Sequence, residues 1–380
     1  MVISNKPLRF IIAILIACLP VFGFANTVTE ATPTQTETAV VANEATPKVV
    51  DEKSEIKEKI KEVIGHHVLD GHEFSLFSDS ETGEHYGFPL PIILWDNGVQ
   101  FFSSSKFNHG EAVAESNGNY YKLLHEKIYK TDASGTLTGD EHNPTNIQPI
   151  DLSITKGVLT IMVVALLMFL LFTSLAKSYA KNGGISSGFG RLFEPIVLYI
   201  RDEIAIPNIG EKHYKKYMSY LLTIFFFVWF LNIFGLTPLG INVTGNIAIT
   251  FGLAVITFVI TNISANKYYW GHIFWMPGVP VPMKIILAPI ELLGVFIKPF
   301  ALMIRLYANI FAGHIVLMSL IGLMFIFKNW MGSSLSFMLS FAISTIEILV
   351  ALLQAYIFTM LSALYFGSAK EEHGHEEAHV

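Results

Sequence analysis

Charged residues are scarce in this 380-residue chain, because Asp, Glu, Lys and Arg together make up only 15% of it. An ordinary soluble domain carries about 25% charged residues. The hydrophobic share is 52%, and the mean hydropathy is +0.49. The formal net charge of -6 excludes the basic surface that nucleic-acid binding requires. The composition therefore indicates a membrane protein.

Cysteine is also nearly absent: Cys18 is the single one, so the chain can form no internal disulfide. The sequence contains no HExxH, GxSxG or Walker-loop motif. The chain therefore has no visible means of hydrolysing ATP by itself. We expect neither a metal nor another cofactor.

The first 25 residues resemble a secretory signal peptide. Lys6 and Arg9 precede an apolar stretch over 10–22, and small residues flank Phe24. This pattern predicts cleavage after Ala25. Two alternatives remain: lipid attachment at Cys18, and an uncleaved anchor, which the short apolar stretch disfavours.

A region of soluble character follows. Residues 26–50 are rich in Thr, Ala, Glu and Pro, a composition typical of a flexible linker. Residues 51–64 read as a short charged helix. Short apolar runs then alternate with turn residues, and Asp96-Asn97-Gly98 is a good β-hairpin signal. We expect a small, mainly β extramembrane domain over 51–155.

Long apolar segments dominate the remainder, residues 156–367. A helix needs about 20 apolar residues to cross the hydrocarbon core of a bilayer. Five segments meet this length, which predicts an all-α polytopic membrane domain. They are 157–176, 217–241, 245–265, 284–327 and 335–367.

The last two segments are too long to cross upright. The segment 284–327 would measure about 65 Å as one helix, twice the thickness of the core. We therefore expect a tilted helical hairpin, with Pro299 as a place to bend. The basic residues of 177–216 predict an amphipathic interfacial helix.

Orientation follows from the Lys and Arg residues of the short loops. The segment 177–216 is heavily basic, and Lys267 and Lys284 flank the next loop on that side. We therefore expect 177–216, 266–283 and the tail 368–380 in the cytoplasm. The N-terminal domain is then outside, as the signal peptide independently requires.

Polar residues gather in the expected hairpin, where ionisable groups usually serve a function. Arg305 and Asn309 share a helix face, as do Glu347 and Gln354. His314 lies about 13.5 Å beyond Arg305 and half a turn out of phase. Glu291 lies about 21 Å before Arg305. The spacing predicts separate tasks at different depths.

Chemistry divides these residues further. Arginine does not release its proton, so Arg305 can only attract a carboxylate or repel a cation. His314 and Glu347 can titrate, so a wet cavity that holds both would pass protons. A fixed cation beside that cavity would stop protons from crossing directly.

Purely structural interpretations remain open for each residue. Arg305 could pair with Glu347 or Glu291 and lock two helices, and His314 could be a packed interface residue. Asn309 and Gln354 could simply join helices by hydrogen bonds. We expect Lys298 to snorkel, Asn232 to satisfy backbone near a helix end, and several other histidines to lie in solvent without a metal. These are His66, His67, His72, His373, His375 and His379.

Several motifs together resemble subunit a of the F-type ATP synthase, over roughly 155–367. Arg305-Leu306-Tyr307-Ala308-Asn309 with Ala312-Gly313-His314 is similar to the family's R-L-x-x-N followed by A-G-x. The other matching stretches are Glu291 to Lys298-Pro299, Glu347 to Gln354 with Ala355-Tyr356-Ile357-Phe358, and Asn232 with Gly235-Leu236-Thr237-Pro238. Tyr307 and Ala308 depart from the commoner Phe-Gly.

This resemblance implies a role for each polar residue. Arg305 would face a rotor ring and separate two half-channels, with Gln354 opposite it. Asn309 would line the outer half-channel, and His314 and Glu347 would form its paired acidic and basic site. Some family members have the glutamate first and the histidine second, so the order is exchanged here. Glu291 would lie near the cytoplasmic exit.

The implied function is proton conduction that couples the proton-motive force to rotation of the ring and to ATP synthesis, without catalysis by this chain. The implied partners are c subunits that carry a membrane carboxylate, peripheral-stalk b subunits and the soluble catalytic head. The implied location is a bacterial inner membrane. Two alternatives are a secondary transporter, although no internal repeat is visible, and a membrane anchor whose outer domain does the work.

Overall fold

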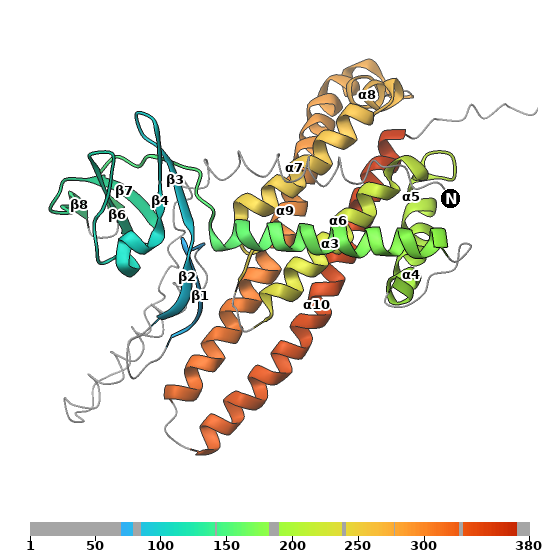
Figure 1. Cartoon of the computed structure of the whole chain (residues 1–380). Coiled ribbons are helices and arrows are strands. Elements are labelled where there is room, and N and C mark those ends of the chain that lie inside the picture. The colour runs from blue at the N-terminus through green and yellow to red at the C-terminus, as the bar shows by residue number, and fades with distance from the viewer. Residues whose placement is uncertain are drawn as a thin grey trace, which may run out of the picture.

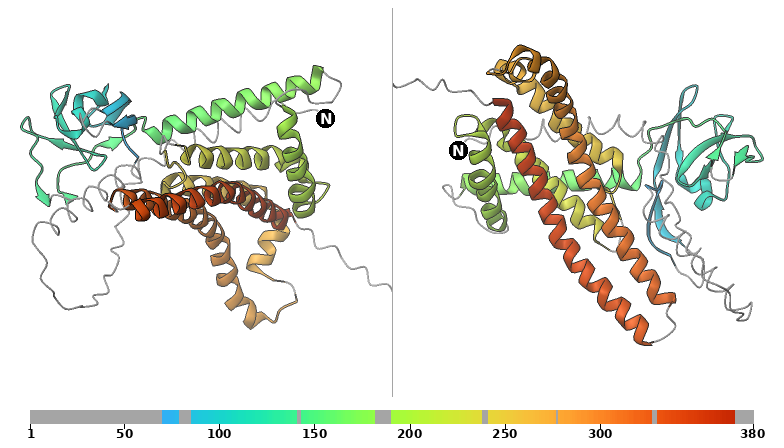
Figure 2. Two further views of the ribbon diagram at one scale, coloured as in Figure 1. Left: turned by 90° about the horizontal axis from the view of Figure 1, so that it is seen from below. Right: turned by 180° about the vertical axis from the view of Figure 1, so that it is seen from behind.

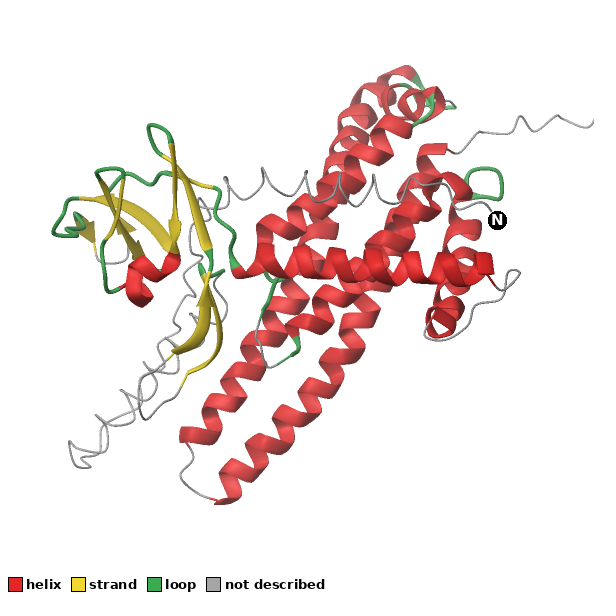
Figure 3. Cartoon of the chain, in the orientation of Figure 1, coloured by secondary structure: helices red, strands yellow, loops and turns green. Residues whose placement is uncertain are grey.

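The computed structural model describes residues 70–78, 85–140, 143–181, 190–237, 241–276, 278–326 and 330–370. The expected signal peptide, the linker 26–50, the charged helix 51–64 and most of the tail lie outside these residues. In Figure 1, a domain of strands stands at one end of a group of long helices. Figure 3 shows that the strands are confined to that domain.

Residues 70–155, which we call the outer domain because they lie at one end of the group of helices, consist of small antiparallel sheets, which confirms the prediction of a mainly β domain. Strand β1 (Glu73–Ser78) pairs with β2 (His85–Pro89). The two three-stranded sheets have the orders β10–β3–β4 and β5–β6–β7. Their strands are β3 (Pro91–Trp95), β4 (Val99–Ser103), β5 (Ala114–Ser116), β6 (Asn119–Leu124), β7 (Lys127–Thr131) and β10 (Ile150–Asp151), and the smaller elements are the 3₁₀ helix η2 (Ser104–Gly110), β8 (Gly139–Asp140) and β9 (Asn143–Pro144).

The predicted hairpin lies between β3 and β4. Trp95 pairs with Val99, and the loop between them places Asn97 at φ 49° and Gly98 at φ 133°. These positive φ values explain why asparagine and glycine occupy the turn. Residues of β3 and β4 point alternately into a core that also includes η2, β5, β6 and β7. The core consists of Ile92, Leu94, Phe102, Phe107, Ala114, Tyr121 and Ile128.

Within the described residues, five helices are long and apolar enough to cross a membrane, as the sequence predicts. The helix α6 ends at Gly235, several residues before the end of the expected segment 217–241. Its aromatic and aliphatic side chains form much of the buried core between the helices. The five helices are α3 (Lys156–Lys181), α6 (Tyr214–Gly235), α7 (Ile247–Ser264), α9 (Val281–Ile326) and α10 (Trp330–Lys370).

Short helices connect the long ones. The expected interfacial helix is divided into α4 (Gly190–Tyr199), a π-helical turn η3 (Ile200–Ala205) and α5 (Ile206–Ile209). Gly210 ends this stretch at φ 86°. Figure 1 shows α4 and α5 at the end of α3 that is remote from the outer domain.

The three segments expected in the cytoplasm meet at that same end. The amide of Asn266, which precedes α8 (Lys267–Phe274), donates to the carbonyl of Ala369 at 2.9 Å. Lys370 Nζ donates to Asn266 Oδ1 at 3.0 Å. A Cβ at Gly367 would collide with the carbonyl oxygen of Asn208, so α10 approaches α5 closely. These contacts bring 177–216, 266–283 and the end of α10 together.

Helices α9 and α10 form the expected over-long hairpin. In the left view of Figure 2, the first part of α9 leaves the line of α10 at a steep angle, and the right view shows the second part beside α10. Pro289 and Pro299 lie inside α9. Because proline has no amide hydrogen to donate, it interrupts the helical hydrogen bonds and permits a bend.

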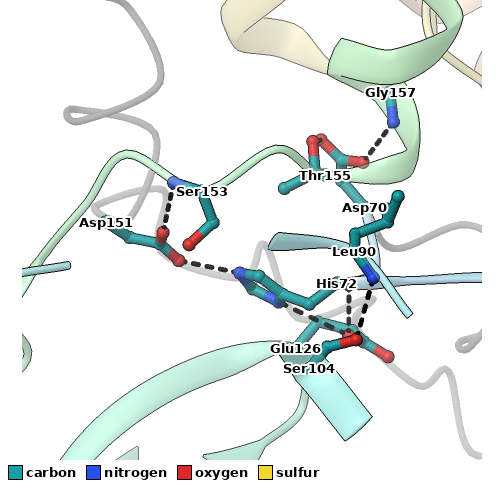
Figure 4. Close-up of polar contacts among 9 residues, drawn as sticks. All are labelled: Asp70, His72, Leu90, Ser104, Glu126, Asp151, Ser153, Thr155 and Gly157. Atoms are coloured by element: carbon teal, nitrogen blue, oxygen red, sulfur yellow. Dashed lines mark hydrogen bonds and ion pairs between the residues drawn. The ribbon is translucent and has the colours of Figure 1, made fainter. Parts of the chain in front are cut away.

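Buried charges join the outer domain to α3. The carboxylate of Asp70 accepts hydrogen bonds from Thr155 Oγ1 and from the amide of Gly157, both at 2.9 Å (Figure 4). Burial raises the pKa of Asp70, although these two hydrogen bonds oppose the shift. The contacts fix the first strand of the domain to the first turn of the membrane helix.

His72 lies in this junction, so the prediction that it is a surface residue is wrong. Its side chain is only 3% exposed, and Nε2 lies 2.8 Å from Asp151 Oδ2 (Figure 4). Nδ1 lies 3.9 Å from Glu126 Oε2. Burial alone would lower the pKa of His72, but the hydrogen bonds and charges of these two carboxylates raise it to about 10.

Candidate functional site

Arg305 projects from the middle of α9 and is exposed. Its neighbours Leu302 and Leu306 are buried, so α9 packs with one side and presents the guanidinium on another. The guanidinium forms no ion pair with any of the described residues, neither with Glu347 nor with Glu291. The structure therefore does not support Arg305 as a lock between two helices of its own chain.

Asn309 and Gln354 connect the two hairpin helices. Asn309 Nδ2 donates to Gln354 Oε1 at 3.0 Å, and the side chain of Gln354 is buried. Since Asn309 follows Arg305 by four residues, the glutamine faces α9 about one turn beyond the arginine. The amide pair sets the register of α9 against α10.

Glu347 lies against the backbone of α9 at Gly313. A Cβ at this glycine would collide with Glu347 Oε1, so an alanine there would displace the end of the glutamate side chain. His314, the next residue, is buried. Glu347 Oε2 is buried and has no hydrogen-bond partner among the described residues. His314 thus directly follows the residue of α9 that Glu347 of α10 faces.

Asn232 of α6 supports α10 beside this site. Its Nδ2 donates to the carbonyl of Ala351 at 3.4 Å, and its Oδ1 accepts from Thr244 Oγ1 at 2.8 Å. Ala351 lies between Glu347 and Gln354 on α10. Asn232 therefore does more than satisfy its own helix end, because it fixes the part of α10 that carries both polar residues.

Two buried serines extend the polar row of α10 toward the hairpin loop. Ser336 and Ser340 lie on the helix face that also carries Glu347. The sequence did not single them out, because serine is common at the interfaces of membrane helices. The one feature that could have identified them is their spacing: Ser340 follows Ser336 by four residues and Glu347 follows Ser340 by seven, which places all three on one helix face.

A second polar group lies on the other side of Arg305 along α9. Lys298 Nζ lies 5.5 Å from the ring centre of Tyr365 and 6.0 Å from that of Tyr269. Burial, and then the charge of Glu291, raise the pKa of Tyr269. Lys298 Nζ thus lies near two aromatic rings, and the charge of Glu291 acts on one of them, Tyr269.

Lys298, Tyr269 and Tyr365 line a cavity between α7, α8, α9 and α10. Thr257, Thr261 and Asn262 of α7 contribute to its wall, together with Lys298 and Tyr365. Tyr365 also interacts electrostatically with Arg305. Sequence reasoning missed both tyrosines, because a tyrosine near a membrane surface is commonplace.

The hairpin therefore has a polar group on each side of one exposed arginine. Toward the hairpin loop lie Asn309, His314, Glu347 and Gln354; toward α8 lie Glu291, Lys298 and the cavity. Chemically, the first group can accept and release protons. Arg305 can only hold a fixed positive charge.

Two family models match the chain. The model described as "ATP synthase A chain" matches residues 158–367, which include all five long helices except their outermost turns. The model described as "Domain of unknown function (DUF8433)" matches residues 63–152, which include the strands of the outer domain.

Curated relatives resemble the chain over most of its length. An ATP synthase subunit a from Chlorobium phaeobacteroides is 41% identical over 283 residues, which cover 71% of this chain and 82% of the relative. One from Chloroherpeton thalassium is 43% identical over 60% of this chain and 70% of the relative. An ATP synthase subunit a 2 from Prosthecochloris aestuarii is 37% identical over 76% and 93%.

Proposed function

The chain belongs to the ATP synthase A chain family, and on that premise we propose that it carries protons to and from a rotor ring through two offset half-channels. The observation that carries this proposal is the exposed, unpaired guanidinium of Arg305 between two polar groups of one helical hairpin. A positive charge in mid-membrane costs at least a few kcal/mol. A negative group on a neighbouring protein would offset that cost.

Arg305 acts as the barrier between the half-channels. It attracts the ionised carboxylate of a ring subunit, and its fixed charge repels protons that would otherwise cross directly. Because the guanidinium forms no ion pair with the residues that the structure describes, it remains available to each ring subunit in turn. The ring carboxylate is released from Arg305 when it takes up a proton.

The outer half-channel runs past His314 and Glu347. Both groups titrate, and Asn309 and Gln354 continue the polar row toward Arg305. Protons enter from outside along this row and load the ring carboxylate. The exchanged order of the histidine and the glutamate preserves the function, because both groups still come from facing helix positions.

The inner half-channel ends near Glu291. The cavity beside Lys298 and Tyr365 lies on this side of Arg305 and supplies polar walls. A proton leaves here after the ring has made nearly a full turn. Each charge that crosses contributes about 2.3 kcal/mol per 100 mV of membrane potential.

The chain works within a complex of ATP synthase subunits in the membrane. We propose that its direct partners are the ring c subunits with their membrane carboxylate and the b subunits of the peripheral stalk, and that the soluble head makes the ATP. The outer domain faces the periplasm, and the end formed by α4, α5, α8 and the C-terminus faces the cytoplasm. The shared position of these segments supports this orientation.

The test is Arg305→Ala in the full complex, with Arg191→Ala as the matched control. Arg191 is also exposed, but it lies on α4, outside the hairpin. We expect Arg305→Ala to abolish proton-driven ATP synthesis in inverted vesicles although the complex assembles, and Arg191→Ala to retain it. Coupled synthesis by Arg305→Ala would contradict the proposal.

Two further measurements separate the rival functions. Uptake of a substrate by the purified chain alone would favour a secondary transporter. Deletion of residues 26–150 should leave proton flux intact in assembled complexes, whereas a membrane anchor for the outer domain would lose all activity. Because imidazole does not carry sodium, ATPase activity should be independent of sodium.

A further inference from the structure

The sheet β10–β3–β4 has an exposed face that is apolar except for Ser103 at the end of β4; we call it the outer sheet face. Trp95 pairs with both Val99 and Ile150, and Ile93 pairs with Phe101, so these side chains lie on one side of the sheet. Phe101 is 68% exposed and Trp95 is 55% exposed. The outer sheet face consists of Ile93, Trp95, Val99, Phe101, Ile150 and Leu152.

Both faces of this sheet therefore carry large apolar side chains, although Gln100 and Asp151 also lie on the opposite face. The opposite face carries Ile92, Leu94 and Phe102, which form the core of the outer domain. An antiparallel sheet with one solvated face normally alternates apolar residues inside with polar residues outside. A continuous exposed apolar patch marks a contact with another molecule or with a membrane.

The chain leads from this face directly into the membrane. The amides of Leu152 and Ile154 donate to the carbonyls of Ile93 and Pro91, so the strand continues beside β3. The helix α3 begins at Lys156, only four residues after Leu152. An extended chain of that length spans about 13 Å at most. The outer sheet face must therefore lie near the bilayer surface.

The arrangement of the domain agrees with this position. In Figures 1 and 2, β3 lies on the side of the outer domain toward the membrane helices, and β6 and β7 lie farther away. Figure 1 also shows that β3 runs across the axis of α3. Such a strand lies along the bilayer surface, so that its side chains reach similar depths.

Lipid is also the neighbour of α3 itself. Met162, Val163, Leu166 and Leu170 are exposed large apolar residues on this helix. They form the surface that a membrane-spanning helix presents to lipid. The outer sheet face is thus continuous, along the chain, with an apolar surface that lies in the bilayer.

We propose that the outer sheet face rests on the outer leaflet and inserts its aromatic side chains into the lipid interface. Tryptophan and phenylalanine favour this region because their rings are accommodated at the boundary between headgroups and acyl chains. Acidic residues outnumber Lys and Arg in residues 70–155, so attraction to anionic headgroups does not drive the contact. Zwitterionic lipid therefore suffices.

The test measures the surroundings of Phe101 in the full chain, reconstituted in zwitterionic liposomes. A nitroxide spin label is attached to Phe101→Cys in a Cys18→Ser background, and its exposure to oxygen and to a water-soluble nickel chelate is compared. Leu166→Cys on α3 is the lipid control. Ala133→Cys, in an exposed turn after β7, is the water control. Val99→Cys provides a second site on the outer sheet face.

We expect the ratio of oxygen to nickel exposure at Phe101 and Val99 to exceed the ratio at Ala133 several-fold and to approach that at Leu166. Equal ratios at Phe101, Val99 and Ala133 would overturn the proposal, because the face would lie in water. Labels shielded from both reagents would also overturn it, because a protein partner or a second copy of the chain would then cover the face.

Discussion

The outer domain and the helical hairpin differ in whether their charged residues have partners within the described part of the chain. In the outer domain, His72 lies 2.8 Å from Asp151, and Lys130 lies 2.6 Å from Asp96. In the hairpin, Arg305 forms no ion pair among the described residues, and Glu347 keeps a buried oxygen without a hydrogen-bond partner there.

Under the proposed function, the difference separates charges that stabilise the fold from charges that act on the rotor ring. A buried charge with a partner fixes two elements against each other. A charge in a membrane helix without a partner in its own chain destabilises that chain, and it persists because another molecule uses it. The same residue types therefore have different meanings in the two regions.

After Arg305→Ala, the largest expected effect is that of Glu347→Gln. The substitution preserves the size of the side chain but removes its ability to titrate, so we expect proton-driven ATP synthesis to fall roughly 1,000-fold, within the range for loss of a proton-transferring group. The measurement is synthesis in inverted vesicles, with Glu203→Gln on the exposed side of η3 as control. Similar synthesis by both variants would show that Glu347 in the hairpin matters no more for function than Glu203 outside it.

The counterpart in the outer domain is His72→Gln. Loss of the imidazolium leaves Asp151 and Glu126 without their cation, which should destabilise the outer domain by about 3 kcal/mol. Hydrogen exchange of β1 and β10 in the full chain measures this effect. Proton-driven synthesis per folded complex should remain. Its loss would contradict the view that His72 stabilises the fold and takes no part in proton transfer.

The same variant tests the pH dependence. The folded pKa of His72 is about 10, above its ordinary value of 6.5, so its stabilisation is complete below pH 6.5 and is lost as the pH rises through 10. Asp151 has a lowered pKa and loses its contribution only in acid. The difference between wild type and His72→Gln should therefore shrink from pH 7 to pH 10; a constant difference would exclude this linkage.

Gly313→Ala should have a smaller effect on the hairpin. Its Cβ would displace the end of the Glu347 side chain, and because a misplacement of about 1 Å can cost up to about 100-fold in rate, we expect roughly a tenfold loss of synthesis. Gly294→Ala in the same helix is the matched control, because nothing lies within 4 Å of its Cβ. Equal activity of the two variants would mean that Glu347 does not need its place against α9.

Asp96→Asn should have the smallest effect. Its carboxylate pairs with Lys130 and accepts from Tyr121 Oη at 3.0 Å, but the pair is partly exposed, and such pairs contribute less than about 1 kcal/mol. The measurement is thermal unfolding of the outer domain, with hydrogen exchange of the amides of β6 as the probe. A loss as large as that of His72→Gln would show that exposure does not distinguish the two ion pairs.

The sequence by itself determined the elements and the candidates. Long apolar segments predicted five membrane helices, and Asp96-Asn97-Gly98 predicted the β3–β4 hairpin, since both signals are local. The separation of Arg305 from His314 along α9 also follows from helical geometry alone. Charged and polar residues in apolar segments pointed to the candidate site residues without any tertiary contact.

Only the tertiary structure decided which residues meet. The hydrogen bond from Asn309 to Gln354, the contact of Glu347 with Gly313 and the support of α10 by Asn232 all join residues far apart in the chain. His72 looked like a surface residue because its partners, Glu126 and Asp151, lie more than 50 residues away. Residue spacing within one helix or strand describes a face, whereas the packing of several elements determines what that face touches.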